Sequence, residues 1–233
     1  MEIITILIMS CIILATLMVL LRMNMKYINF IKKIGNDRKL NEITNSLPDN
    51  EVICKEILSM LGNERVNVKV GDENKQASLY IVATNTILIA NIKNTFTRVQ
   101  TIAHECIHSV QDKRLLWFNF AFSNVYLLYF YIVTFLTLIN KISTPNIFAI
   151  ILVMMSIMMF FVRSFLEIDA MTKARFLAEK YMLRNPNKIK EDNVELIVEN
   201  YDRLNSVGIK FYDFSLLAKC LVRVIIYCVI ALV

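Results

Sequence analysis

The sequence predicts a mainly α-helical membrane protein with about four transmembrane helices and a small cytosolic α+β domain. Its composition is 56% hydrophobic with a mean hydropathy of +0.51, well above the average for a soluble domain. Four apolar runs are long enough to cross a bilayer as helices, and a segment with strand-like alternation lies between the first two. The apolar runs are residues 3–21, 115–139, 147–166 and 214–233.

These runs divide the chain into five parts. An N-terminal transmembrane anchor (1–21) is followed by a cytosolic α+β part (22–114), a transmembrane helical hairpin (115–166), a cytosolic helical part (167–213) and a C-terminal transmembrane helix (214–233). We interpret the first run as a signal anchor, because it is too long for the apolar region of a cleaved signal peptide and no small-residue cleavage site follows it.

Two basic residues interrupt the last run. Lys219 can extend its ammonium group to the lipid headgroups, whereas Arg223 lies deeper and needs a protein or water partner. Alternatively, both side chains bind lipid headgroups or an acidic group.

The distribution of positive charge predicts the orientation of the chain. The net charge is +6, and six basic residues follow the first apolar run, while no basic residue precedes it. This asymmetry places the N-terminus outside and residue 22 onward in the cytoplasm of a multi-pass cell-membrane protein. No basic stripe interleaved with aromatic residues accompanies it, so nucleic acid is not a predicted partner. The six basic residues are Arg22, Lys26, Lys32, Lys33, Arg38 and Lys39.

The five cysteines do not indicate a disulfide framework. Their number is odd and no CxxC motif occurs, which fits a reducing compartment. Cys106 lies between two histidines, yet helical geometry turns it away from them, so we interpret it as a packing residue.

The first cytosolic part has helix and strand patterns in sequence. The spacing predicts a helix over 51–61, strands over 66–70, 77–82 and 86–90, and a helix from 94 or 95 to about 114. Residues 86–90 could form a sheet edge with which an extended substrate pairs. An ordinary buried strand is an equally good interpretation.

Both histidines of the chain lie in the run His104-Glu105-Cys106-Ile107-His108. Positions i and i+4 share one face of a helix, so the two imidazoles can bind one metal ion with Glu105 beside it. This HExxH arrangement is typical of zinc hydrolases, in which the glutamate takes a proton from zinc-bound water. The alternative is a buried histidine pair on an amphipathic helix.

A catalytic zinc site requires a third protein ligand. No other histidine exists, so the sequence favours a carboxylate over a thiolate. Asp112 is too close in sequence to close around the ion, although it could orient a ligand. Glu167 is the next acidic residue along the chain, and the predicted hairpin returns it to the membrane surface from which the chain left after His108.

The helix predicted around Glu167 has a stripe of alanines on the same side, which allows close approach of a second helix. The stripe consists of Ala170, Ala174 and Ala178. Asp169 points elsewhere and could hydrogen-bond a histidine or exchange roles with Glu167. The alternative for Glu167 is a carboxylate that marks the end of a membrane span and the N-terminus of the following helix.

The segments TIAHECIHSVQ (101–111) and EIDA (167–170) resemble a family of membrane-bound neutral zinc metallopeptidases of bacteria, whose members have similar AHExxHxxQ and E-x-D-A motifs. These enzymes are gluzincins, distantly similar to HtpX-type and CAAX-prenyl-type membrane endopeptidases, in which a transmembrane hairpin also separates the motifs. The resemblance covers about residues 77–180 in order and spacing.

The resemblance implies a zincin-like cytosolic domain that binds Zn²⁺ through His104, His108 and Glu167, with Glu105 catalytic. Two positions differ. The family usually has glycine where this chain has Ile107, and the HtpX-type pattern has an aspartate at position 171, where this chain has methionine. The second difference favours the neutral metallopeptidase family.

The sequence therefore predicts a zinc-dependent membrane endopeptidase that hydrolyses peptide bonds of a protein or peptide substrate at the cytosolic membrane surface. Glu105 is the expected general base. Tyr181, Tyr201 and Arg203 are candidates for the group that stabilises the oxyanion.

Two other classes of function compete with this prediction. One is a non-enzymatic membrane adaptor or sensor that binds zinc for structure through a fourth protein ligand, such as Cys106 or Asp169. The other is a helical membrane scaffold without a metal.

Overall fold

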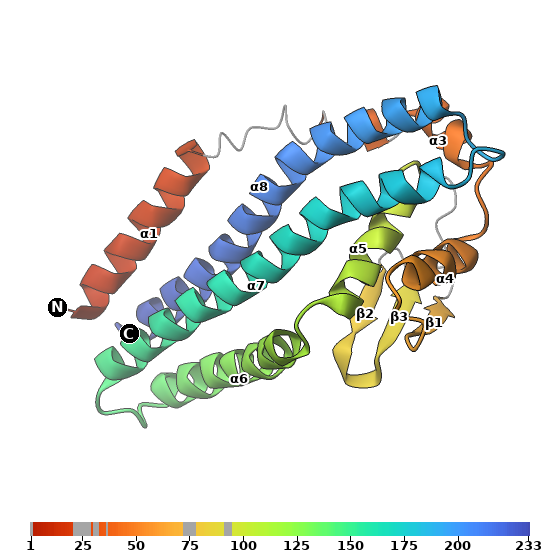
Figure 1. Ribbon diagram of the computed structural model, residues 1–233. Coiled ribbons are helices and arrows are strands. Elements are labelled where there is room, and N and C mark those ends of the chain that lie inside the picture. The colour runs from red at the N-terminus through yellow and green to blue at the C-terminus, as the bar shows by residue number, and fades with distance from the viewer. Residues whose placement is uncertain (1, 21–28, 30–32, 36, 72–77, 91–94) are drawn as a thin grey trace. The chain divides into compact units, whose positions relative to one another are not determined.

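The computed structural model describes the chain except residues 1, 21–28, 30–32, 36, 72–77 and 91–94. Most described residues are helical, and one small sheet is present (Figure 1). The elements are α1 (Glu2–Leu20), α3 (Arg38–Thr44), α4 (Asn50–Met60), β1 (Asn67–Val70), β2 (Leu79–Ile81), a 3-10 turn (Val82–Thr84), β3 (Thr86–Ile89), α5 (Arg98–Val110), α6 (Lys113–Leu138), α7 (Pro145–Leu183) and α8 (Glu191–Ile230).

Three of the described helices, α1, α6 and α7, are long and apolar enough to cross a membrane. The fourth predicted span, 214–233, is helical as far as Ile230 and forms the C-terminal part of α8. It is not among the three, because the last 18 residues of α8 (213–230) contain three charged residues, Asp213, Lys219 and Arg223. The mainly α-helical class with a small sheet agrees with the prediction, and a fourth transmembrane helix stays a prediction.

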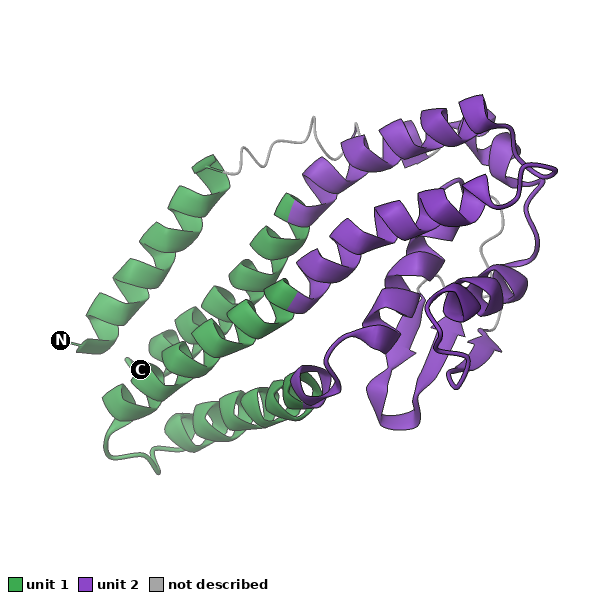
Figure 2. Ribbon diagram, viewed as in Figure 1, with its two compact units in different colours: residues 1–23, 118–165, 210–233 green, residues 24–117, 166–209 purple. Residues whose placement is uncertain are grey.

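The described chain divides into two compact units (Figure 2), and each has its own core. Unit 1 comprises residues 1–23, 118–165 and 210–233. Its core combines aromatic and small side chains of α6, α7 and α8, and the Tyr126 hydroxyl lies 2.9 Å from Oγ of Ser156. Large apolar side chains cover its outside, as expected for helices that face lipid. Examples are Leu128, Met154 and Phe161.

Unit 2 comprises residues 24–117 and 166–209 and contains the sheet. The strand order is β1-β3-β2, with β1 parallel and β2 antiparallel to β3. The central strand β3 is the segment predicted as a possible edge, so that prediction is wrong. Three of its four residues are apolar, and Thr86, Ile87 and Ile89 are buried while Leu88 is half-buried, as expected for a strand with two neighbours. Among the described residues, no strand pairs with the outer edge of β2, which contacts α5.

The predicted helix over 94–114 is two helices, with a break at Gln111 and Asp112. Gln111 has extended backbone angles (φ −63°, ψ 164°) and ends α5. The Asp112 carboxylate accepts hydrogen bonds from the backbone N–H groups of Arg114 and Leu115 at 2.7 and 3.1 Å, which caps the N-terminus of α6. The helix with the HExxH motif is therefore separate from the membrane-length helix that follows it. Asn94 lies outside the described residues.

Candidate metal centre

Helix α5 presents both histidines on one face because its opposite face is buried in the core of unit 2. Four small or apolar side chains on that opposite face are at most 1% exposed, namely Val99, Ile102, Ala103 and Cys106. This pattern fixes the rotation of the helix, so that His104 and His108 lie one turn apart with side chains 19% and 12% exposed. Both imidazoles are thus partly shielded from water but accessible.

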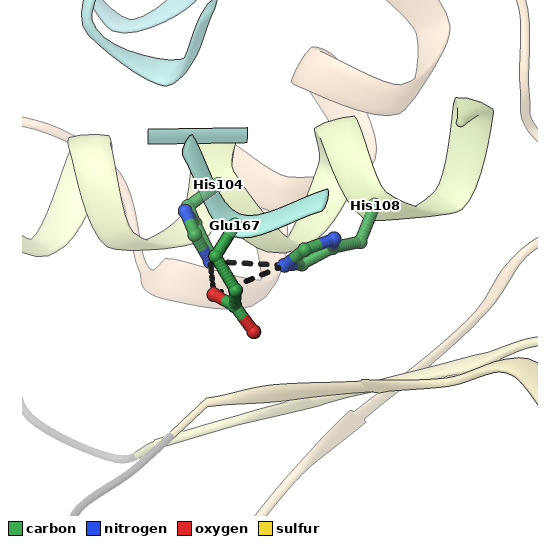
Figure 3. Close-up of side chains that lie close together, drawn as sticks. All are labelled: His104, His108 and Glu167. Atoms are coloured by element: carbon green, nitrogen blue, oxygen red, sulfur yellow. Dashed lines mark hydrogen bonds and ion pairs between the residues drawn. The ribbon is translucent and has the colours of Figure 1, made fainter. Parts of the chain in front are cut away.

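The third side chain of the cluster is that of Glu167 (Figure 3), a residue in the middle of α7 and not at either end of it. Its Oε2 atom is 3.4 Å from Nε2 of His104 and 3.7 Å from Nε2 of His108. The two Nε2 atoms are 3.0 Å apart. Since α7 runs unbroken from Pro145 to Leu183, Glu167 does not begin a helix, which removes the part of the alternative that places it at a helix N-terminus.

The three atoms fit a single ion. Atoms with these separations lie on a circle with a radius of about 2.0 Å, which matches the zinc–nitrogen and zinc–oxygen distances of protein sites. Among the described residues, this is the group of three or more potential ligands that is arranged for one ion. Two imidazoles and one carboxylate are also a donor set typical of catalytic zinc.

Glu105 lies on the sheet side of α5 and is 6% exposed. The backbone N–H of Tyr80 in β2 donates a hydrogen bond of 2.6 Å to its Oε2 atom. Burial raises the pKa of the Glu105 carboxyl, and the neighbouring histidines and the Tyr80 N–H only partly offset this effect. A carboxylate with a raised pKa is better suited to accept and return a proton near neutral pH.

His108 is held by a second hydrogen bond outside the cluster. Its Nδ1 atom lies 2.7 Å from Oε1 of Gln111, three residues further along the chain. Burial works against a charged imidazole, but the nearby Glu167 carboxylate and the hydrogen bond to Gln111 outweigh it and raise the pKa of His108. The orientation of the His108 ring is therefore fixed by contacts at both of its nitrogen atoms, to Gln111 at Nδ1 and to His104 at Nε2.

The other residues considered as ligands have different partners. Asp112 caps α6 rather than orienting a histidine. Asp169 bonds the side-chain amide of Gln111 at 2.9 Å and the ammonium group of Lys173 at 2.5 Å. Cys106 is fully buried, with its Sγ atom 3.7 Å from Sγ of Cys54, in agreement with its interpretation as a packing residue.

The three residues suggested for oxyanion stabilisation are also engaged elsewhere. The hydroxyl groups of the buried residues Tyr181 and Tyr201 donate to Glu56 and to the carbonyl of Phe96 at 2.6 and 2.8 Å. Arg203 forms an exposed ion pair within α8. These contacts direct none of the three side chains toward the histidine–glutamate cluster. A role of these residues in oxyanion stabilisation is therefore not supported.

Two residues of the site, Gln111 and Tyr80, were not identified from the sequence. Gln111 was visible as the last letter of the motif, and its spacing of three from His108 was the available signal. The contribution of Tyr80 comes from its backbone N–H, so no side-chain pattern could have indicated it.

Comparisons of the chain with protein-family models, curated proteins and solved structures gave no match.

Proposed function

We propose that this protein is a zinc-dependent membrane endopeptidase with Glu105 as the general base. The observation that supports it best is the convergence of Nε2 of His104, Nε2 of His108 and Oε2 of Glu167 to within 3.0–3.7 Å of one another. A buried carboxylate with a raised pKa directly beside the first histidine completes the arrangement expected of an HExxH hydrolase.

In this proposal, the three side chains of the cluster hold the ion. Zinc supplies Lewis acidity, which makes water more acidic and polarises a carbonyl group. Glu105 accepts the proton of the attacking water, and the carbonyl carbon gains the hydroxyl group. Glu105 then returns the proton to the amide nitrogen as the carbon–nitrogen bond breaks. The products are a carboxylic acid and an amine. Because Glu105 has given up the proton that it accepted, it returns to its starting carboxylate form.

The open edge of β2 supports a peptide as the substrate. This strand lies against α5, as its hydrogen bond to Glu105 shows, and its residue Leu79 is 55% exposed. An extended peptide could pair with the part of that edge that Glu105 does not occupy, with its backbone close to the catalytic glutamate. The basic residues after the first apolar run favour a cytosolic location for this reaction.

The experiment measures zinc content and peptide cleavage of the purified, detergent-solubilised chain without a histidine tag. We expect one zinc per chain in the wild type and in Glu105→Gln, and none in His108→Ala. Cleavage of labelled casein should fall by about 10²- to 10⁴-fold in Glu105→Gln. Glu199→Gln, at an exposed position of α8, is the matched control. Unchanged cleavage by Glu105→Gln would overturn the proposal.

The structural-zinc alternative requires a fourth protein ligand. Among the described residues, the group arranged for one ion has three members, and Cys106 and Asp169 have other partners. These contacts favour a catalytic over a structural site.

A further inference from the structure

The side chain of Gln111 connects the two helices that present the cluster. Gln111 follows α5 directly, and its extended backbone turns the side chain back toward His108. Its Oε1 atom lies 2.7 Å from Nδ1 of His108. Its Nε2 atom donates to the carbonyl of Leu166 at 2.8 Å and to Oδ2 of Asp169 at 2.9 Å, both on α7. Leu166 is the residue immediately before Glu167.

The partners of the amide determine which of its atoms faces the histidine. A carbonyl and a carboxylate can only accept hydrogen bonds, so the atom that meets them must be the NH₂ nitrogen of Gln111. The opposite orientation would place three oxygen atoms together and leave the NH₂ group facing the imidazole. Asp169 and the Leu166 carbonyl thereby fix the orientation of the Gln111 amide.

This orientation also fixes the tautomer of His108. Because Oε1 of Gln111 can only accept, Nδ1 of the neutral imidazole must hold the hydrogen. Nε2 then has a free lone pair, and this is the atom that faces His104 and Glu167. A metal-binding histidine needs that lone pair, and a hydrogen bond on the other ring nitrogen commonly secures it.

We infer that Gln111, oriented by Asp169, is a positioning residue that keeps His108 in its ligand tautomer and holds α5 and α7 at the separation a shared ion requires. This inference rests on the proposed zinc site and assigns a role to two residues that are not ligands. Asp169 acts on His108 through the amide and does not contact the ion. Its pair with Lys173, 59% exposed, is peripheral.

The first test compares Gln111→Met with Gln100→Met. Both glutamines belong to α5 or its end, and both use the side-chain amide to reach another helix, since Gln100 donates to Asn205 of α8 at 2.6 Å. Gln100 does not bond a histidine, so it controls for the loss of a helix-bracing amide. We expect Gln111→Met to weaken zinc binding about 10- to 100-fold in competition with a chromophoric chelator. Gln100→Met should stay within about threefold of the wild type.

The second readout is the tautomer itself, measured in the zinc-free protein by ¹⁵N NMR at pH 9. The chain contains only two histidines, so two pairs of ring signals are expected. In the wild type, His108 should be in the Nδ1–H form, and Gln111→Met should introduce the Nε2–H form. Retention of the Nδ1–H form or of wild-type zinc affinity in Gln111→Met would overturn the inference.

Asp169 provides a second pair of variants should Gln111→Met not fold. Asp169→Ala removes the acceptor that orients the amide, whereas Asp169→Asn can still accept through its Oδ1 atom. We expect several-fold weaker zinc binding in Asp169→Ala and recovery in Asp169→Asn. Equal affinities in the wild type and Asp169→Ala would refute this part. Absence of zinc from the wild type would instead refute the proposed function, so the two failures are distinguishable.

Discussion

The backbone N–H of Tyr80 donates a hydrogen bond of 2.6 Å to the carboxylate of Glu105. This bond joins the edge strand β2 to the HExxH helix and provides a fixed donor for a carboxylate whose pKa burial raises. The same contact orients Glu105 on the sheet side of α5. The sheet edge therefore both borders the proposed substrate position and adjusts the basicity of the proposed catalytic residue.

Loss of this N–H should make Glu105 a weaker acid. Tyr80→Pro removes the hydrogen, and proline is compatible with an edge strand at a position whose N–H does not pair within the sheet. Tyr80→Ala loses the same ring but keeps the N–H, so it is the matched control. We expect the acid limb of the pH–activity profile for casein cleavage to lie about one pH unit higher in Tyr80→Pro than in Tyr80→Ala. Coincident acid limbs would show that the bond does not control the glutamate.

The raised pKa of Glu105 also predicts how stability depends on pH. In the folded, zinc-free protein the pKa lies above the ordinary glutamate value of about 4.3, because burial disfavours the charged form. The native state therefore favours protonated Glu105, a contribution that is fully present below pH of about 4 and is lost as pH rises through the folded-state pKa. Glu105→Gln is neutral throughout and lacks this dependence.

Thermal unfolding of both zinc-free proteins between pH 4 and 8 measures this effect. The difference in melting temperature, wild type minus Glu105→Gln, should decrease as pH rises. Zinc should reduce the slope, because a nearby dication favours the carboxylate. A difference that is constant or increases with pH would contradict the assigned burial of this group.

Local patterns in the sequence account for most of what was predicted correctly. The helices α1, α6 and α7 follow from uninterrupted apolar runs, and the shared face of His104 and His108 follows from helical periodicity alone. The proximity of Glu167 could be expected because it is the first acidic residue after a helical hairpin returns the chain. In each case the deciding information lies within one element or one connection.

Features that depend on distant neighbours were not predictable in this way. Strand order depends on packing between segments that are distant in the sequence. Local patterns therefore allowed β3 to be either an edge or a buried strand, and the structure shows that it is central. The break after α5 depends on the cap provided by Asp112, which looks like any polar residue between two helices. The hydroxyl groups of Tyr181 and Tyr201 bond Glu56 and the Phe96 carbonyl, partners distant in the sequence that local patterns do not reveal.

Replacement of Cys106 separates the catalytic from the structural interpretation of zinc. Its thiol lies against Cys54 in the core between α4 and α5, with no exposed surface. Cys106→Ala should leave the zinc dissociation constant within about twofold and lower the melting temperature, because the cavity costs about 1 kcal/mol. Cys54→Ala, which removes the other thiol of the pair, should have the same effect. A large loss of zinc affinity in Cys106→Ala alone would instead indicate a fourth ligand.

The stability of the HExxH helix should depend strongly on Arg98 in its first turn. Arg98 is 4% exposed, and its guanidinium donates at 2.7–3.0 Å to the segment that connects α3 and α4. The acceptors are the carbonyl oxygens of Thr44, Leu47 and Pro48 and Oδ1 of Asn50. Arg98→Met keeps much of the volume but removes the four hydrogen bonds that the guanidinium donates in this largely buried region, so we expect a loss of about 3 kcal/mol.

The matched control is Arg203→Met, which removes an arginine paired with Glu199 on α8, where both side chains are more than half exposed. An exposed pair of this kind contributes about 0–1 kcal/mol, so its melting temperature should change little. Arg98→Lys should lie between the two, because an ammonium group has three donors but lacks the planar geometry that reaches four acceptors. Equal melting temperatures of Arg98→Met and Arg203→Met would show that these acceptors reach water when the guanidinium is removed.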